Sequence, residues 1–297
     1  MSASAGAPRQ DSLKAGILVI LFGILLFSGV DVLNKLLGQT LSVVQILWVR
    51  FLVFVPIAAA IAWRRDGGIA WRSKRPRLQL ARAALLTVEM GMFVAALKYL
   101  PLVDVQAILA SAPLMVVALS VPLLGETVGW RRWTAVAAGF VGVLIIVRPG
   151  LVEIGTGAML ALIGTVMWAV YQIMLRLVGR EDPASTTALW TAVVGLAMTS
   201  AVVPFHWTPP SAEGWAMLAA IAVLGAGGHS ALTKAFALAP ASALQPFTYA
   251  QLVLSGWLGW LVFGDVPDAW TVTGATLIVC AGLYSLHRSR VRETGSG

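Results

Sequence analysis

Runs of about 20 apolar residues recur from one end of this 297-residue chain to the other, and that is the length a helix needs to cross a hydrocarbon core of roughly 30 Å. Lipid offers the backbone no hydrogen-bond partners, so a spanning segment must be a helix or part of a closed barrel, and uninterrupted runs favour helices. The composition agrees, since 59% of the residues are hydrophobic and 11% are charged. The sequence therefore predicts an all-α polytopic membrane protein.

Ten transmembrane helices are expected, because stretches rich in glycine, proline and charged residues separate ten apolar runs. These stretches are too short to hold a soluble domain. The expected spans are approximately residues 15–37, 42–63, 78–98, 103–123, 130–148, 155–178, 184–204, 214–236, 243–263 and 269–287.

The chain contains one five-span unit twice. Residues separated by 139 positions match in pairs: Pro101 and Pro240, Gln106 and Gln245, Gly125 and Gly264, and Glu126 and Asp265. The first unit is expected over residues 1–150, with a tail at 1–14, and the second over residues 151–297, with a basic tail. Five is an odd number, so the second unit enters the membrane inverted. Inverted repeats are typical of secondary transporters, whose substrate site lies near the midplane between the repeats.

Lysine and arginine mark the orientation. Of the 21 basic residues, 17 fall in segments on the same side as the N-terminus. Cytoplasmic loops carry this excess, so we expect both termini to be cytoplasmic, in the inner (plasma) membrane of the cell. The net charge of +8 is thereby explained by topology, and no nucleic acid is expected as a partner.

The repeated features identify a family resemblance. Each unit has a turn proline, a fourth span that ends in Gly-Glu or Gly-Asp, and a glycine-rich fifth span, and the second span contains Trp48-Val-Arg50-Phe-Leu. In these features the chain resembles the ten-helix EamA branch of the drug/metabolite transporter superfamily. The resemblance implies a carrier for amino acids or other small metabolites, often an exporter. It also implies that spans 1, 3, 4, 6, 8 and 9 surround a central cavity.

Ionisable residues inside the spans are the first site candidates, because a charge in lipid is costly and usually faces the bundle interior. Glu89 lies near the middle of the third span, and His229 lies near the matching position in the eighth. They could face the substrate path or form a structural contact between helices. Arg50, in the second span, needs a carboxylate, for which Glu89 and Asp31 are the candidates. It could bind a substrate carboxylate or serve structure alone.

A second cluster lies near the outer end of the first span. Asp31, Asn34 and Lys35 fall at positions i, i+3 and i+4, and the acid precedes the lysine in the order that favours a helix ion pair. Asp31 and Asn34 are therefore gate candidates, with an interfacial ion pair between Asp31 and Lys35 as the plainer interpretation.

Polar and aromatic residues on the spans that line the family's cavity complete the set. Trp168 and Tyr171 share a face of the sixth span, and Gln245 and Tyr249 are expected to share a face of the ninth. Such faces suit an amphipathic or flat solute, and the alternative is helix packing. The remaining candidates are Gln172 and Ser111.

An enzyme is the rival class, but three separated histidines and one cysteine provide no metal-ligand spacing or nucleophile motif. We expect no cofactor and no metal. The expected partners are a small-molecule substrate, protons as a candidate coupling ion, and the lipid bilayer, with the chain a monomer or weak dimer. The predicted function is export of an amino acid, aromatic or large and apolar. The alternatives are uptake of a planar metabolite such as riboflavin or S-adenosylmethionine, and a membrane-embedded enzyme.

Overall fold

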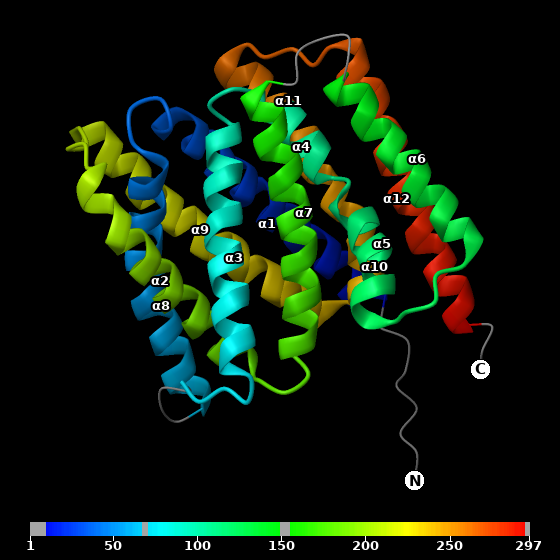
Figure 1. Ribbon diagram of the computed structural model, residues 1–297, viewed down its shortest axis with the longest axis horizontal. Helices are drawn as coiled ribbons and strands as arrows, with labels where there is room; N and C mark the ends of the chain where they lie inside the picture. Colours follow the sequence, from blue (N-terminus) through cyan, green and yellow to red (C-terminus); the bar gives the residue numbers. More distant parts are fainter. Residues whose placement is uncertain (1–9, 67–70, 149–154, 295–297) are drawn as a thin grey trace.

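The computed structural model describes residues 10–66, 71–148 and 155–294, and over these ranges its regular structure is entirely helical (Figure 1). The first helix begins and the last helix ends at the same end of one bundle. The elements are α1 (Gln10–Leu37), α2 (Val43–Asp66), α3 (Pro76–Ala96), α4 (Leu102–Leu109), α5 (Ala112–Leu124), α6 (Trp130–Val147), α7 (Thr156–Val178), α8 (Ala184–Val202), η1 (Val203–Phe205), α9 (Ala212–Leu238), α10 (Ala241–Leu244), η2 (Gln245–Tyr249), α11 (Ala250–Phe263) and α12 (Ala269–Thr294).

Nine helical segments of the described chain are long and apolar enough to cross a membrane. The ninth expected span, 243–263, is divided among α10, η2 and α11, so its pieces are individually too short. Pro246 lies in η2, where it supplies no backbone N–H for an α-helix. The fourth span is also interrupted, between α4 and α5, just before Pro113. The prediction of an all-helical polytopic protein is confirmed, and the fourth span of each unit is broken.

The two units share local geometry as well as sequence. Gly125 ends α5 and Gly264 ends α11, both in the left-handed region with φ of 67° and 72°. In each case the N–H of the following residue donates to the carbonyl six positions earlier, over 3.3 Å and 3.2 Å. The glycine N–H itself donates to the carbonyl four positions earlier, over 3.1 Å and 2.9 Å, which is the hydrogen bond of an αL cap. Glycine favours this cap because it has no Cβ. The repeat therefore fixes the same helix end at opposite ends of the bundle.

The first helix of each unit packs against the other unit. The helix α1 lies along α9 and α11, and its counterpart α7 lies along α3 and α5. We call α1, α9, α10, η2 and α11 the α1 bundle, and α3, α4, α5 and α7 the α7 bundle. The pairs α2–α8 and α6–α12 contact each other across the two units. Each bundle thus combines helices from both halves of the sequence.

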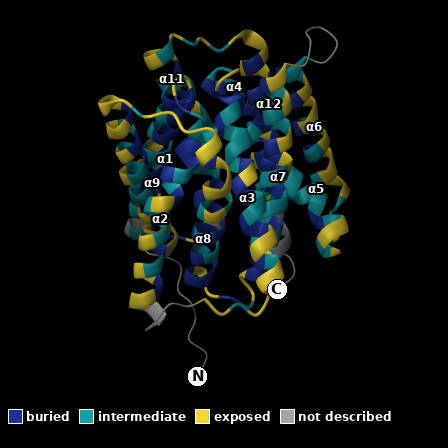
Figure 2. Ribbon diagram, turned by 60° about the vertical axis from the view of Figure 1, so that its left-hand side comes forward, coloured by how far each residue is buried: buried dark blue, intermediate teal, exposed yellow. Residues whose placement is uncertain are grey.

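Large apolar side chains cover the outward faces of the helices, as a lipid-facing surface requires (Figure 2). Phe22 and Phe140 are exposed in the middle of their helices. Tryptophans lie exposed near helix ends, among them Trp63, Trp130 and Trp270, where their amphipathic rings suit the membrane interface.

Asp182 ties together one end of the α7 bundle. Its carboxylate accepts hydrogen bonds from the Ser73 hydroxyl, from the Lys74 backbone N–H at 2.9 Å and from the Gln79 amide at 2.9 Å. Burial alone would raise the pKa of this carboxyl, but these three donors outweigh it and hold the pKa below its usual range. The stretch before α3 is thereby fixed to the turn between α7 and α8.

The helices α6 and α12 approach each other closely. A Cβ placed on Gly142 would lie 2.8 Å from both the Gly274 carbonyl oxygen and Ile278 Cγ1, and one placed on Gly274 would lie 2.5 Å from the Gly142 carbonyl oxygen. Small residues allow such backbone contact, which supplies much of the packing energy between helices in lipid.

Gly142→Ala should therefore lower the thermal unfolding midpoint in detergent, since overpacking of a tight contact costs about 1–3 kcal/mol. Gly225→Ala in α9 is the matched control, because nothing lies within 4 Å of a Cβ added there. Equal midpoints for the two variants would contradict the packing assigned to α6 and α12.

Candidate functional site

Charged side chains from four helices converge on Arg50. The guanidinium, on α2, interacts electrostatically with Asp31 on α1, Glu89 on α3 and His229 on α9. Both carboxylates proposed from the sequence as partners of Arg50 are therefore its neighbours. Among the described residues, the four ion pairs shorter than 4 Å include neither Arg50 nor Glu89. We call Asp31, Arg50, Glu89 and His229 the charged centre.

Glu89 is the member of the charged centre with the least compensation. Its side chain is buried, with 4% of the residue exposed, and no hydrogen bond reaches its carboxylate from any residue in the described ranges. An ionised carboxylate in that setting requires a cation or a proton as partner. Arg50 contributes electrostatically, but the described residues supply no bonded partner. The partner of the Glu89 carboxylate therefore comes from outside the chain.

His229 is exposed, and its imidazole lies edge-to-face with Phe27, with ring centroids 5.0 Å apart. The sequence pairs His229 with Glu89 as repeat counterparts. The structure connects the two through Arg50, which interacts with both, while no contact between them occurs in the described residues.

An aromatic pair on α7 adjoins the charged centre. Trp168 and Tyr171 stack with centroids 5.2 Å apart and planes 24° apart. Tyr171 also interacts electrostatically with Glu89. The predicted shared face of Trp168 and Tyr171 is present.

Arg82 holds this aromatic pair in place. Its guanidinium donates to the Tyr171 hydroxyl at 3.4 Å and lies 5.4 Å from the centre of that ring. The residue is fully buried, and it also donates to the Thr187 carbonyl at 3.0 Å and the Thr191 hydroxyl at 2.8 Å. The sequence reasoning counted Arg82 among the basic loop residues and missed it. Its spacing in the sequence could have identified it, since Arg82 precedes Glu89 by seven positions and so shares its helix face.

Asp31 accepts two side-chain hydrogen bonds from the fourth spans of the two units. Gln106 Nε2 of α4 lies 2.8 Å from Asp31 Oδ2, and Gln251 Nε2 of α11 lies 2.9 Å from the same oxygen. Asp31 is therefore a junction between α1 of one bundle and α4 of the other.

The predicted ion pair between Asp31 and Lys35 is wrong. Lys35 Nζ instead lies 2.6 Å from Asp265 Oδ2, and it donates to the Leu100 carbonyl at 3.2 Å. The packing of α1 against α11 brings the lysine to the acid that follows the ninth span, and Asp31 accepts from two glutamines instead. Asn34 is buried, and its Oδ1 has no hydrogen-bond partner among the described residues.

Gln245 and Tyr249 do not share a helix face, because residues 245–249 form a 3₁₀ helix in which positions four apart diverge. The Tyr249 hydroxyl points at α12 and leaves no room for a Cβ at Gly282. Ser111 donates to the Ile108 carbonyl at 2.6 Å and lines an apolar groove between α5 and α6. Gln172 is half-buried on α7.

No three histidine, cysteine, aspartate or glutamate side chains in the described ranges lie close enough together to hold a metal ion. The charged centre and the adjoining aromatic pair offer charge and an aromatic surface, which suit an organic ion.

Ten spans in two units, with ionisable side chains at their meeting point, define a membrane transporter of small molecules. The chain belongs to the EamA-like transporter family, which matches it twice, over residues 14–148 and 155–286.

Relatives agree on transport and differ in substrate. The chain is 26% identical to the S-adenosylmethionine uptake transporter of Rickettsia prowazekii (95% of this chain, 96% of the relative) and 30% identical to the riboflavin transporter of Rhizobium johnstonii (83% and 86%). It is 25% identical to the pseudopaline exporter CntI of Pseudomonas aeruginosa (91% and 95%). A solved crystal structure covers 94% of this chain and 99% of its own with a TM-score of 0.65; at 19% identity it supports the fold alone.

Arg82→Lys should lower the unfolding midpoint, because an ammonium cannot reach the tyrosine, the carbonyl and the threonine together, and losing hydrogen bonds from a charged group costs about 1.5–3 kcal/mol. Arg77→Lys is the matched control, since Arg77 is exposed on the same helix. Indistinguishable midpoints for the two variants would show that Arg82 does not anchor Tyr171.

Proposed function

We propose that this protein is a secondary carrier for a metabolite with an amino-acid head group and a planar or aromatic body. The observation that carries the proposal is Glu89, a buried carboxylate to which no described residue donates a hydrogen bond and on which Arg50 of the neighbouring helix acts electrostatically. The α-carboxylate of such a substrate would pair with Arg50, and its α-ammonium group would pair with Glu89. A guanidinium binds a carboxylate through two parallel hydrogen bonds, and a buried carboxylate binds an ammonium.

The aromatic pair would receive the body of the substrate. Trp168 and Tyr171 present stacked rings beside Glu89. Planar groups bind such surfaces by stacking and by burial of apolar area. Aromatic amino acids and S-adenosylmethionine both combine an amino-acid head with a planar portion.

Of these two substrates, the net charge of the charged centre favours S-adenosylmethionine. With both acids ionised, Asp31, Glu89 and Arg50 sum to one negative charge, and the sulfonium metabolite carries one net positive charge. A neutral zwitterion would leave that charge uncompensated. The similarity over 95% of the chain to an S-adenosylmethionine uptake transporter supports the same choice.

Riboflavin is the second candidate. The aromatic pair and the similarity to a riboflavin transporter favour it, but an uncharged isoalloxazine would leave Arg50 and Glu89 without new partners. As to direction, relatives bear the names of uptake and of export proteins, and a carrier runs in whichever direction the gradients dictate. Export remains the sequence-based expectation, with Glu89 as the candidate proton site.

The moving bodies in this proposal are the α1 and α7 bundles rather than the two sequence halves. At the end of the molecule where α1 finishes, α4 packs against α11, and hydrogen bonds also cross between the bundles: Gln106 donates to Asp31, and Lys35 donates to the Leu100 carbonyl beside α4. The repeat counterparts of Asp31 and Gln106 are Gln172 and Gln245. Neither of their amides hydrogen bonds to a described residue, which supports assigning this structure to a state closed at one end only.

Two ion pairs act as permanent clamps in this scheme. Lys35 pairs with Asp265 at 2.6 Å, and their repeat counterparts Arg176 and Glu126 pair at 2.5 Å. Both pairs are formed at once, whereas gates at opposite ends would alternate. Each pair also lies within one bundle, so rocking of the bundles would leave it intact.

Proteoliposomes test the substrate. We expect saturable flux of labelled S-adenosylmethionine, inhibited by unlabelled compound, and a loss of at least about tenfold in Glu89→Gln, the effect of removing one charge-assisted contact. Glu213→Gln is the matched control, because Glu213 is exposed at the start of α9.

An imposed pH gradient that drives accumulation in the wild type but not in Glu89→Gln would support proton coupling. Flux of phenylalanine or tryptophan instead would select the amino-acid substrate, and riboflavin flux the second candidate. No flux of any of these from folded, inserted protein would overturn the proposal.

Cross-linking tests the moving bodies, in a Cys280→Ser background. A bifunctional thiol reagent joining Gln172→Cys to Gln245→Cys should stop flux, because it would lock the end that is open in this structure. The same reagent across Lys35→Cys and Asp265→Cys should give the same flux as this double variant without reagent, because Lys35 lies in α1 and Asp265 directly follows α11 of the same bundle. Loss of flux in the second pair would refute the assignment of the bundles.

A further inference from the structure

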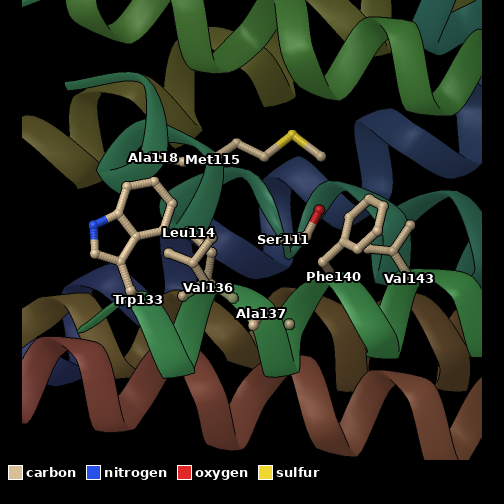
Figure 3. A pocket seen from close by; sticks show the side chains of 10 residues that line it. Ser111, Leu114, Met115, Ala118, Trp133, Val136, Ala137, Phe140 and Val143 are labelled. Carbon is tan, nitrogen blue, oxygen red and sulfur yellow. The ribbon is translucent and has the colours of Figure 1, made fainter. Parts of the chain in front are cut away.

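An apolar groove of about 310 Å³ lies between α5 and α6, away from the charged centre (Figure 3). Ser111 provides a hydroxyl at its lining, and that hydroxyl is already bonded to the Ile108 carbonyl. The groove opens to the membrane side of the bundle, because Trp133 and Phe140 in its wall are 44% and 58% exposed. Its remaining walls are Leu114, Met115, Ala118, Val136, Ala137, Gly139 and Val143.

The groove has the length of one membrane leaflet. Trp133 lies at one end and Val143 at the other in Figure 3, and both project from α6. Ten residues of α-helix rise about 15 Å, which is half of a roughly 30 Å hydrocarbon core. Since α6 begins at Trp130, the end at Trp133 lies near the membrane surface and the other end lies near the midplane.

Positive charge lies beside the surface end of the groove. Arg131 and Arg132 directly precede Trp133, and the Arg132 Nε is buried without a hydrogen-bond partner among the described residues. The first turn of α6 contains no acidic residue, and Gly129 gives it no side-chain cap, so its free N–H groups favour an anion. Glu126, the nearest acid along the chain, is engaged by Arg176.

We propose that this groove is a binding site for an anionic phospholipid. One acyl chain lies between α5 and α6, and the phosphate and its head group lie at Arg131, Arg132 and the start of α6. The apolar length, the one-leaflet depth and the cationic end match the parts of such a lipid in order. The site is independent of the substrate and of the transport mechanism.

Native mass spectrometry of the full-length protein tests the site, with phosphatidylglycerol and phosphatidylcholine of identical acyl chains as probes. Wild-type protein should retain the anionic lipid about thirtyfold better, the effect of two arginines near a phosphate at about 1 kcal/mol each. R131Q/R132Q should lose this preference. R72Q/R77Q is the matched control, because both arginines are exposed at the same membrane surface. A118F should fill the groove and reduce retention of both lipids.

Equal retention of the two lipids by the wild type would overturn the proposal, and so would an undiminished preference in R131Q/R132Q. Undiminished retention of lipid by A118F would show that the acyl chain does not lie in the groove. Unfolding midpoints of all variants separate lost binding from lost folding, and A118L serves if A118F fails to fold.

Discussion

A charge within the hydrocarbon core must find its partner inside the protein, and this constraint decides how the helices of the carrier meet. Lys35 of the first unit reaches Asp265 of the second, and Arg176 of the second reaches Glu126 of the first. Arg82 is surrounded by a tyrosine, two threonines and a glutamine. These groups are neutralised or hydrogen bonded by the chain itself. Glu89 is not, and that difference separates the groups that hold the fold from the group available to a ligand.

The contacts of the central site differ between the two ends of the molecule. Gene duplication predicts two equivalent sets of contacts, and the helix caps and the clamps conform to that expectation. The contacts of Asp31 do not, because its repeat counterpart is the uncharged Gln172. One end of the molecule is thus joined by a carboxylate to two amides, while amides alone are available at the other end. Unequal strengths at the two ends would bias the carrier toward the state described here.

Much of the architecture follows from the sequence. The apolar runs located the spans, and the matching prolines and glycines revealed the repeat, because backbone requirements in lipid leave few alternatives. Side-chain partners were harder to predict. Lys35 has two acids within reach, and only the packing of α1 against α11 decides between them. Tyr249 could be placed on a cavity face only by assuming a regular helix, and Pro246 removes that assumption. Arg82 was hidden because a basic residue near a span end resembles a topology signal.

The exchange of first helices between the units also bears on how the fold could have originated. A single five-span unit would leave the face of its first helix that contacts α9 without a partner, and its third span would lack the helix that α7 supplies. A second copy in the opposite orientation provides both at once. An ancestor with one unit would therefore have needed to insert in both orientations and assemble as an antiparallel pair. Fusion of two copies would then have made that pairing permanent, freeing each copy to diverge as Asp31 and Gln172 have done.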